Sequence, residues 1–295
     1  MHRRLQLDFF GENRYPIGYR RGVQPVKKEK PARQKRVVWK ELQEQIREHK
    51  VTFAVYLILR GIVIAAMLLS LVRRDYENLF YCTLSLILFL APAFVERNLG
   101  IRLPSTMEVI ILLFIFAAEI LGEMSSFYVK YAFWDTMLHT LNGFLCAAVG
   151  FSLVDILNRN KKVRFNLSPL FLAIVAFCFS MTVGVLWEFF ECGADLLLHT
   201  DMQKDTVLHS ISSVALDPTK SNTPVHINDI TSVTVNGAAL PVDGYLDIGL
   251  YDTMKDLFVN FIGAVVFSVI GFFYVKGRAR FAKQFIPTVK EDGEE

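Results

Sequence analysis

The sequence predicts an all-α membrane protein, a bundle of six transmembrane helices with a small β-hairpin inserted in one connecting loop. Hydrophobic residues make up 53% of the 295 residues and the mean hydropathy is +0.34, both high for a soluble protein of this length. The apolar residues also fall into six blocks. Each block is long enough to cross about 30 Å of hydrocarbon at about 1.5 Å per helical residue.

The first fifty residues precede every apolar block and carry 14 basic and six acidic residues. Residues 1–34 are expected to be a disordered, basic cytoplasmic tail. Within residues 35–50, Val38, Leu42 and Ile46 recur every four positions, which predicts a juxtamembrane amphipathic helix on anionic lipid headgroups. The alternative is that this charge serves only as a topology signal. Nucleic acid is not expected as a partner, because no binding fold accompanies the charge.

The apolar blocks divide the rest of the chain into helices and connections. Residues 51–198 are expected to hold the first five transmembrane helices, residues 199–249 an extracytoplasmic loop, residues 250–275 the sixth helix and residues 276–295 a cytoplasmic tail. The predicted spans are 51–72, 79–95, 107–127, 133–157, 167–187 continuing toward Leu198, and 257–275.

The distribution of lysine and arginine predicts the orientation. Of the 32 basic residues, 25 lie on the face that holds both termini, six lie on the opposite face, and Arg60 lies within the first span. Cytoplasmic loops carry the excess of basic residues, so both termini are expected in the cytoplasm and residues 199–249 outside.

The expected outer loop contains ITSVTVNGAALPV, residues 230–242, in which Asn236 and Gly237 separate two short strand-like runs. Asn-Gly is the strongest two-residue hairpin signal, because both residues tolerate a positive φ. A β-hairpin is therefore predicted, either as a bridge between the fifth and sixth spans or as a lid over a site.

Ionisable residues gather near the predicted outer end of four spans. Spacings of three and four residues put the members of each set on one helical face. Because the direction of the chain alternates, all four sets are expected at a similar depth. The sets are Glu119 and Glu123, Asp135 and His139, Glu188 with Glu191 and Asp195, and Asp252 with Asp256 and Asn260.

Taken singly, these residues have structural explanations. Asp135 and Asp252 are suited to N-caps, and Glu191 and Asp195 to a helix end entering water. His139 and Asp256, however, lie one turn inside their helices, where capping does not explain them. Ionisable groups in membrane spans usually face a bundle interior or a water-filled cavity. Their crowded negative charge predicts either bound cations or protonated carboxyl groups.

A divalent metal ion is expected: carboxylate oxygens suit Mg²⁺, Mn²⁺ or Ca²⁺, and the one imidazole also allows Zn²⁺ or Fe²⁺. Neither a GxSxG nucleophile motif nor a phosphate-binding glycine-rich loop is present, which disfavours serine catalysis and nucleotide use. The candidate metal ligands are Asp135, His139, Glu188, Glu191, Asp252 and Asp256.

Three segments carry a family resemblance: DTMLHTLNGF in the fourth span, WEFFE in the fifth and YDTMKDLFVNFIGA at the start of the sixth. Their combination resembles the YjdF-like family of bacterial inner-membrane proteins, with a more distant likeness to VanZ-like membrane proteins. The resemblance covers roughly residues 50–275 and implies a multi-pass protein of the bacterial cytoplasmic membrane. It implies no particular reaction.

Three functions follow from these observations. An enzyme would use the cation to polarise a phosphoryl or acyl oxygen of a lipid headgroup or lipid-linked envelope precursor. An ion- or proton-coupled transporter would use the same carboxylates, although no matching acidic set or broken-helix repeat is found toward the cytoplasmic end. A non-catalytic membrane scaffold is the third.

Overall fold

The computed structural model describes residues 50–99, 101–159 and 167–289. The predicted N-terminal tail, and all of the predicted amphipathic helix except its last residue, lie outside the described residues. Within them, six helical segments are long and apolar enough to cross a membrane, as the sequence predicts. The prediction of a helical membrane protein is thus confirmed.

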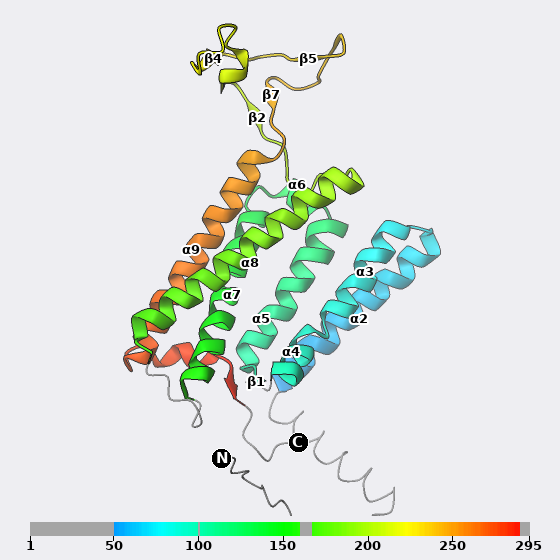
Figure 1. The fold of residues 1–295 in the computed structure, drawn as a ribbon. Coiled ribbons are helices and arrows are strands. Elements are labelled where there is room, and N and C mark those ends of the chain that lie inside the picture. The colour runs from blue at the N-terminus through cyan, green and yellow to red at the C-terminus, as the bar shows by residue number, and fades with distance from the viewer. Residues whose placement is uncertain (1–49, 100, 160–166, 290–295) are drawn as a thin grey trace, which may run out of the picture. The chain divides into compact units, whose positions relative to one another are not determined.

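The helices run in chain order through the bundle (Figure 1). They are α2 (Lys50–Arg73), α3 (Tyr76–Leu88), α4 (Ala91–Leu99), α5 (Ser105–Phe116), the π-helix η1 (Ala117–Met124), α6 (Phe127–Lys130), α7 (Trp134–Arg159), α8 (Pro169–Leu198), α9 (Leu250–Val275) and the 3₁₀-helix η3 (Arg280–Phe285).

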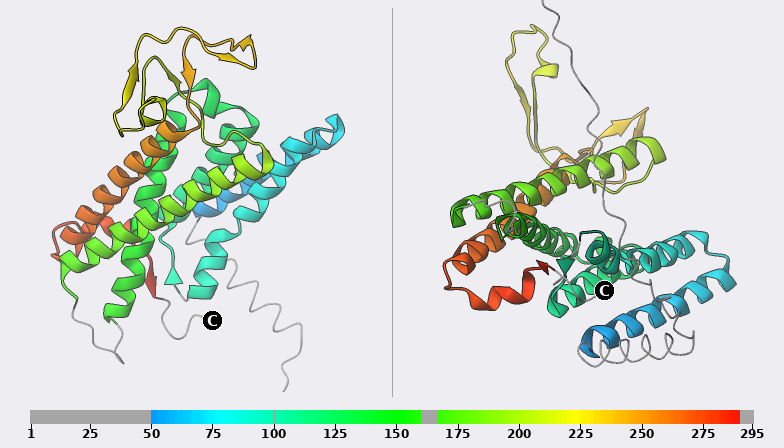
Figure 2. Two further views of the ribbon diagram at one scale, coloured as in Figure 1. Left: turned by 45° about the horizontal axis from the view of Figure 1, so that its top comes forward. Right: turned by 60° about the horizontal axis from the view of Figure 1, so that its bottom comes forward.

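Helices α7, α8 and α9 pack against one another more extensively than any other elements and form a three-helix core (Figures 1 and 2). Glycines permit the close approach of α7 to α9. A Cβ atom on Gly263 would lie 2.0 Å from the backbone oxygen of Thr140, and one on Gly143 would lie 2.2 Å from that of Asn260. Small residues at such crossings let helix backbones approach closely inside a membrane.

Helices α2 and α3 pack together and against α5, beside the three-helix core (Figure 2). Their own apolar cluster includes Val63, Cys82 and Leu112, each no more than 1% exposed. Much of the remaining surface of α2 is exposed and apolar, including Leu57, Ile58 and other large side chains. Such a surface suits contact with lipid chains.

Two of the predicted spans are continuous in the sequence but interrupted in the structure. The second divides between α3 and α4 just before Pro92, whose ring lacks an N–H donor and clashes with the carbonyl four residues earlier. The third changes from α5 to the π-helix η1, which carries Glu119 and Glu123. Hydrophobic periodicity does not reveal a π-helix, because the apolar pattern continues through it.

The segment after α9, expected only as a cytoplasmic tail, packs back onto the bundle. Ala282 and Ile286 are buried in the core, and the Phe285 ring lies 5.4 Å from that of Phe144 on α7. Strand β8 (Thr288–Val289) then pairs antiparallel with β1 (Ile101–Arg102). This pairing closes the end of the bundle that lies opposite the inserted loop (Figure 1).

The loop between α8 and α9 is built from three short antiparallel pairs. Strand β2 (Val207–Leu208) pairs with β7 (Tyr245–Leu246), β3 (Ile211–Ser213) with β4 (Val225–Ile227), and β5 (Thr234–Val235) with β6 (Ala238–Ala239). Asn236 and Gly237 join β5 to β6 with φ values of 50° and 85°. The predicted hairpin is confirmed, with the positive φ angles that its Asn-Gly turn requires.

Candidate functional site

The six candidate ligands lie at the end of the three-helix core that carries the inserted loop. Asp135 and His139 come from α7, Glu188 and Glu191 from α8, and Asp252 and Asp256 from α9. All except Asp135 are buried, with exposed fractions from 1% for Asp256 to 9% for His139. The spacing that the sequence shows does bring these three polar helix faces together.

Three aspartates surround one lysine, and we call Asp135, Asp252 and Asp256 the aspartate group. The Lys255 Nζ lies 2.7 Å from Asp252 Oδ1, 3.3 Å from Asp135 Oδ2 and 3.7 Å from Asp256 Oδ1. Asp252 also accepts a hydrogen bond of 2.9 Å from the backbone N–H of Lys204. Asp252 is not the N-cap of α9, a position that Gly249 occupies.

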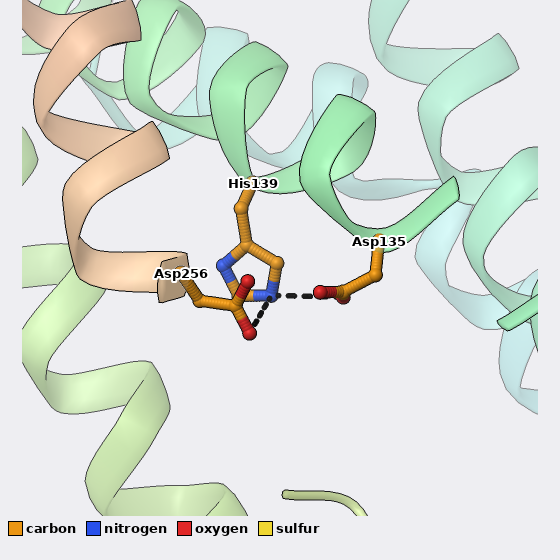
Figure 3. A group of neighbouring side chains, drawn as sticks. All are labelled: Asp135, His139 and Asp256. Atoms are coloured by element: carbon orange, nitrogen blue, oxygen red, sulfur yellow. Dashed lines mark ion pairs between the residues drawn. The ribbon is translucent and has the colours of Figure 1, made fainter. Parts of the chain in front are cut away.

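His139 lies between the aspartate group and α8. Its Nε2 is 3.4 Å from Asp135 Oδ1 and 3.7 Å from Asp256 Oδ2, as Figure 3 shows. Its Nδ1 is 3.9 Å from Glu188 Oε1. The imidazole therefore contacts carboxylates through both ring nitrogens.

Glu188 and Glu191 form the second group, which we call the glutamate group. Together with His139 they offer ligand atoms that all lie within 4.8 Å of one another. The indole N–H of Trp187 donates a 2.8 Å hydrogen bond to Glu191 Oε1 and so fixes that carboxylate. Trp187 itself is 44% exposed on the apolar side of α8.

Three carboxylate oxygens in the site are buried without a hydrogen bond: Asp135 Oδ2, Glu188 Oε2 and Asp256 Oδ1. A buried polar atom without a partner costs about 1–3 kcal/mol, and more when it carries charge. Five carboxylates share the basic groups of Lys255 and His139, and within the described ranges neither Glu188 nor Glu191 pairs with a lysine or arginine. Carboxyl groups therefore outnumber basic groups in the site, mainly beside the glutamate group.

Asp195 does not join either group but organises the chain that leaves α8. Its carboxylate accepts hydrogen bonds from the backbone N–H groups of Met202 and Gln203, at 2.7 and 2.9 Å, and from the Thr200 hydroxyl at 2.8 Å. The Gln203 side chain in turn donates to the Thr253 hydroxyl on α9. Asp195 thus fixes the start of the inserted loop against the first turn of α9.

The fourth predicted set contributes no residue to either group. Glu119 and Glu123 belong to the π-helix η1, which packs mainly on α3 and α5, and neither belongs to the two metal-compatible groups of the described residues. Three of the four sets therefore converge.

Tyr128 is a site neighbour that sequence reasoning missed. Burial raises the pKa of its phenol well above the usual range, and the negative charges of Glu123, Asp135, Glu119 and Glu191 raise it further. The phenol therefore keeps its proton and can donate a hydrogen bond. A tyrosine on the short helix α6 has no spacing signal that links it to the acidic sets.

Hydrogen bonds between the three core helices continue one turn below the site. Asn260 accepts a 3.3 Å hydrogen bond from the Asn142 side chain, and its own amide donates to the Ser180 backbone oxygen. Below this level the rings of Phe151 and Phe267 are fully buried, with centroids 6.0 Å apart. Aromatic packing therefore fills the centre of the three-helix core.

Comparison with known families identifies residues 55–277 as a match to the predicted membrane protein family DUF2238. The chain belongs to this family. The match is consistent with the resemblance to YjdF-like proteins and shows no likeness to VanZ-like proteins. No curated protein and no solved structure matches the chain.

The matched region of this DUF2238 protein contains all six candidate ligands, the inserted loop and most of every candidate span. The basic N-terminal region lies outside the match. The family assignment supports a multi-pass membrane protein and assigns no reaction to it.

Proposed function

We propose that this protein binds a divalent cation at the outer end of its three-helix core, with His139, Glu188 and Glu191 as the principal ligands. The observation that supports this proposal most strongly is the charge of the glutamate group. Two buried carboxylates lie beside one imidazole, and the buried Glu188 Oε2 makes no hydrogen bond. A divalent cation would satisfy that oxygen and neutralise both carboxylates.

The contacts of the aspartate group support placing the cation at the glutamate group. Lys255 already supplies it with positive charge, whereas the glutamate group has no such partner among the described residues. Asp135 and Asp256 also lie beside His139 Nε2 and are placed to accept its proton. That tautomer leaves the Nδ1 lone pair, on the side of Glu188, free for a cation.

The spacing of the ligand atoms is compatible with an ion. Oxygen and nitrogen ligands bind Mg²⁺, Zn²⁺ and Ca²⁺ at about 2.0–2.6 Å, so two ligands of one ion lie at most about 5 Å apart. The atoms of His139, Glu188 and Glu191 lie within 4.8 Å of one another. Small side-chain movements would complete a site for Mg²⁺, Mn²⁺, Ca²⁺ or Zn²⁺.

The reaction class that we propose is cation-assisted chemistry on a lipid headgroup or lipid-linked envelope precursor of the bacterial cytoplasmic membrane. The excess of basic residues on the side of the termini supports an outward-facing site. There the cation would polarise a phosphoryl or acyl oxygen, and a carboxylate of the aspartate group would serve as base. On the cytoplasmic side, the basic N-terminal region would contact anionic lipid headgroups.

Coupled transport is less well supported by this geometry. A transport path requires polar lining on both sides of the binding site. Within the described part of the chain, hydrogen bonds between the core helices reach as deep as Asn260, and the buried rings of Phe151 and Phe267 pack below that level. The site is therefore suited to access from one membrane face.

The proposal is tested by Mn²⁺ binding to the purified, chelator-stripped protein in detergent, followed by electron paramagnetic resonance. Wild type should bind one equivalent, and Glu188→Gln and Glu191→Gln should each weaken that binding at least about tenfold, because each removes a ligand charge. Asp243→Asn, which removes an exposed carboxylate from the inserted loop, is the matched control. Equal binding by all four proteins would refute the assignment of the ligands.

A further inference from the structure

Lys255 does not fully satisfy the carboxylates that surround it. Among the residues that the structure describes, its ammonium group donates one hydrogen bond, 2.7 Å to Asp252 Oδ1. Asp135 Oδ2 and Asp256 Oδ1 lie at 3.3 and 3.7 Å from the same nitrogen but accept no hydrogen bond. The aspartate group therefore presents more oxygen ligands and more negative charge than one ammonium group uses.

Asp256 is the strongest sign that another ligand belongs here. Its side chain is 2% exposed and one of its oxygens is buried, directed toward Lys255 and without a hydrogen bond. Leaving a buried carboxylate oxygen unpaired is costly unless something compensates for it. This observation is independent of the clustering of the aspartates.

The Lys255 side chain is able to move away from the aspartate group. Its side chain is 43% exposed, whereas the side chains of Asp252 and Asp256 are 10% and 2% exposed. A lysine ammonium on a flexible four-carbon stem reaches water by side-chain rotation alone. Helix α9 need not unfold for the aspartate group to lose its tethered cation.

We propose that the aspartate group is a second divalent-cation position, which the Lys255 ammonium occupies until a divalent cation displaces it. The ligands are Asp135 and Asp256, which with His139 form a group whose ligand atoms lie within 4.8 Å of one another, and Asp252, whose Oδ1 lies 2.7 Å from the ammonium nitrogen that would leave. The three carboxylates are oxygen donors, which favours Mg²⁺, Mn²⁺ or Ca²⁺. This inference goes beyond the proposed function, because it adds a position that other residues form on the other side of His139. The two cations would flank one imidazole.

Competition with the lysine sets the affinity of this second position. A divalent cation must displace an ammonium group that is already close to three carboxylates, so wild type should bind the second cation weakly. Removing the ammonium charge removes the competitor. The second binding step should then tighten by about tenfold or more, while the first step, at the glutamate group, changes little.

The experiment is a Mn²⁺ titration of the chelator-stripped, full-length protein in detergent, comparing wild type with Lys255→Met and Lys255→Arg. Methionine keeps much of the length and loses the charge, whereas arginine keeps the charge. Lys255→Met should bind two equivalents at concentrations where wild type and Lys255→Arg bind one. The double variant Lys255→Met with Asp256→Asn should return to one equivalent.

Unchanged binding by Lys255→Met, with a thermal unfolding transition as sharp as that of wild type, overturns the proposal. If Lys255→Met fails to fold, Lys255→Gln provides the same comparison with a polar side chain. The first bound equivalent of Mn²⁺ reports on the glutamate group. The second reports on the aspartate group, which Lys255 occupies in wild type. Failure of the proposed function and failure of this inference therefore give different binding curves.

Discussion

Two carboxylates one turn apart on α8 have different roles. Glu191 faces the site and is fixed by the Trp187 indole, whereas Asp195 accepts three hydrogen bonds from the chain that follows the helix. Their spacing of four residues places both on one helical face and suggests a shared role. The structure separates them, because Asp195 lies in the last turn, within reach of the backbone of residues 200–203.

Replacing Asp195 by alanine should destabilise the protein by about 1–3 kcal/mol, because backbone N–H groups of Met202 and Gln203 lose a charged acceptor. The cation-dependent part of the stability should remain, since Asp195 belongs to neither ligand group. Thermal unfolding with and without added cation measures both effects. A variant that kept its full stability but lost its response to the cation would place Asp195 among the ligands.

The sequence predicts the candidate ligands better than it predicts their partners. Spacings of three and four residues identify which side chains share a helix face, and His139 and Asp256 indeed converge. The same reasoning does not separate the aspartate group from the glutamate group, because that division depends on where the Lys255 ammonium lies. Tyr128 and Gln203 come from a short helix and a loop, which have no periodic pattern to follow.

At the scale of elements, glycine contacts fix the distance between α7 and α9 and hence the geometry of the site. A Cβ on Gly263 would come within 2.0 Å of the Thr140 oxygen, which is backbone and moves only with the helix. Helix lengths and most boundaries follow from hydrophobic blocks. The break before Pro92 has a visible cause in the sequence, whereas no residue in the sequence signals the π-helix η1.

Gly263→Ala should lower the free energy of unfolding by about 1–3 kcal/mol, because the new methyl group forces α7 and α9 apart. Gly193→Ala on α8 is the matched control, since no atom lies within 4 Å of its added Cβ. That control should be neutral, or more stable by up to about 1 kcal/mol. Equal effects of both substitutions on the unfolding temperature would contradict the close-packing account.

At the scale of the whole molecule, a reaction on an envelope lipid requires the site and the inserted loop to face outward. The positive charges predict this orientation, while the fold itself shows only that the loop and the β1–β8 pair lie at opposite ends. Hydropathy predicts the number of spans because each helix must bury its backbone hydrogen bonds in lipid. The packing of residues 280–289 onto the bundle has no comparable signal, and the sequence predicted only a tail there.

Orientation is testable with single cysteines in a variant that lacks the four native ones. A cysteine at Asn222, exposed in the inserted loop, should react with a membrane-impermeant maleimide in intact cells. A cysteine at Gln284, on the opposite end, should react only after the membrane is opened. The reverse pattern would place the acidic site on the cytoplasmic face and remove the argument for an envelope substrate.

Cation-dependent unfolding of the wild-type protein measures directly whether the folded protein binds a divalent cation. A cation that binds only the folded state adds about 2.7 kcal/mol of stability at about a hundredfold excess over its dissociation constant. We therefore expect Mg²⁺, Mn²⁺, Ca²⁺ or Zn²⁺ to raise the unfolding temperature of chelator-stripped protein in detergent, and Glu191→Gln to lose most of that rise. If none of the four ions shifts the transition, while lowering the pH from 7 to 5 stabilises the protein, then protons rather than cations neutralise the carboxylates.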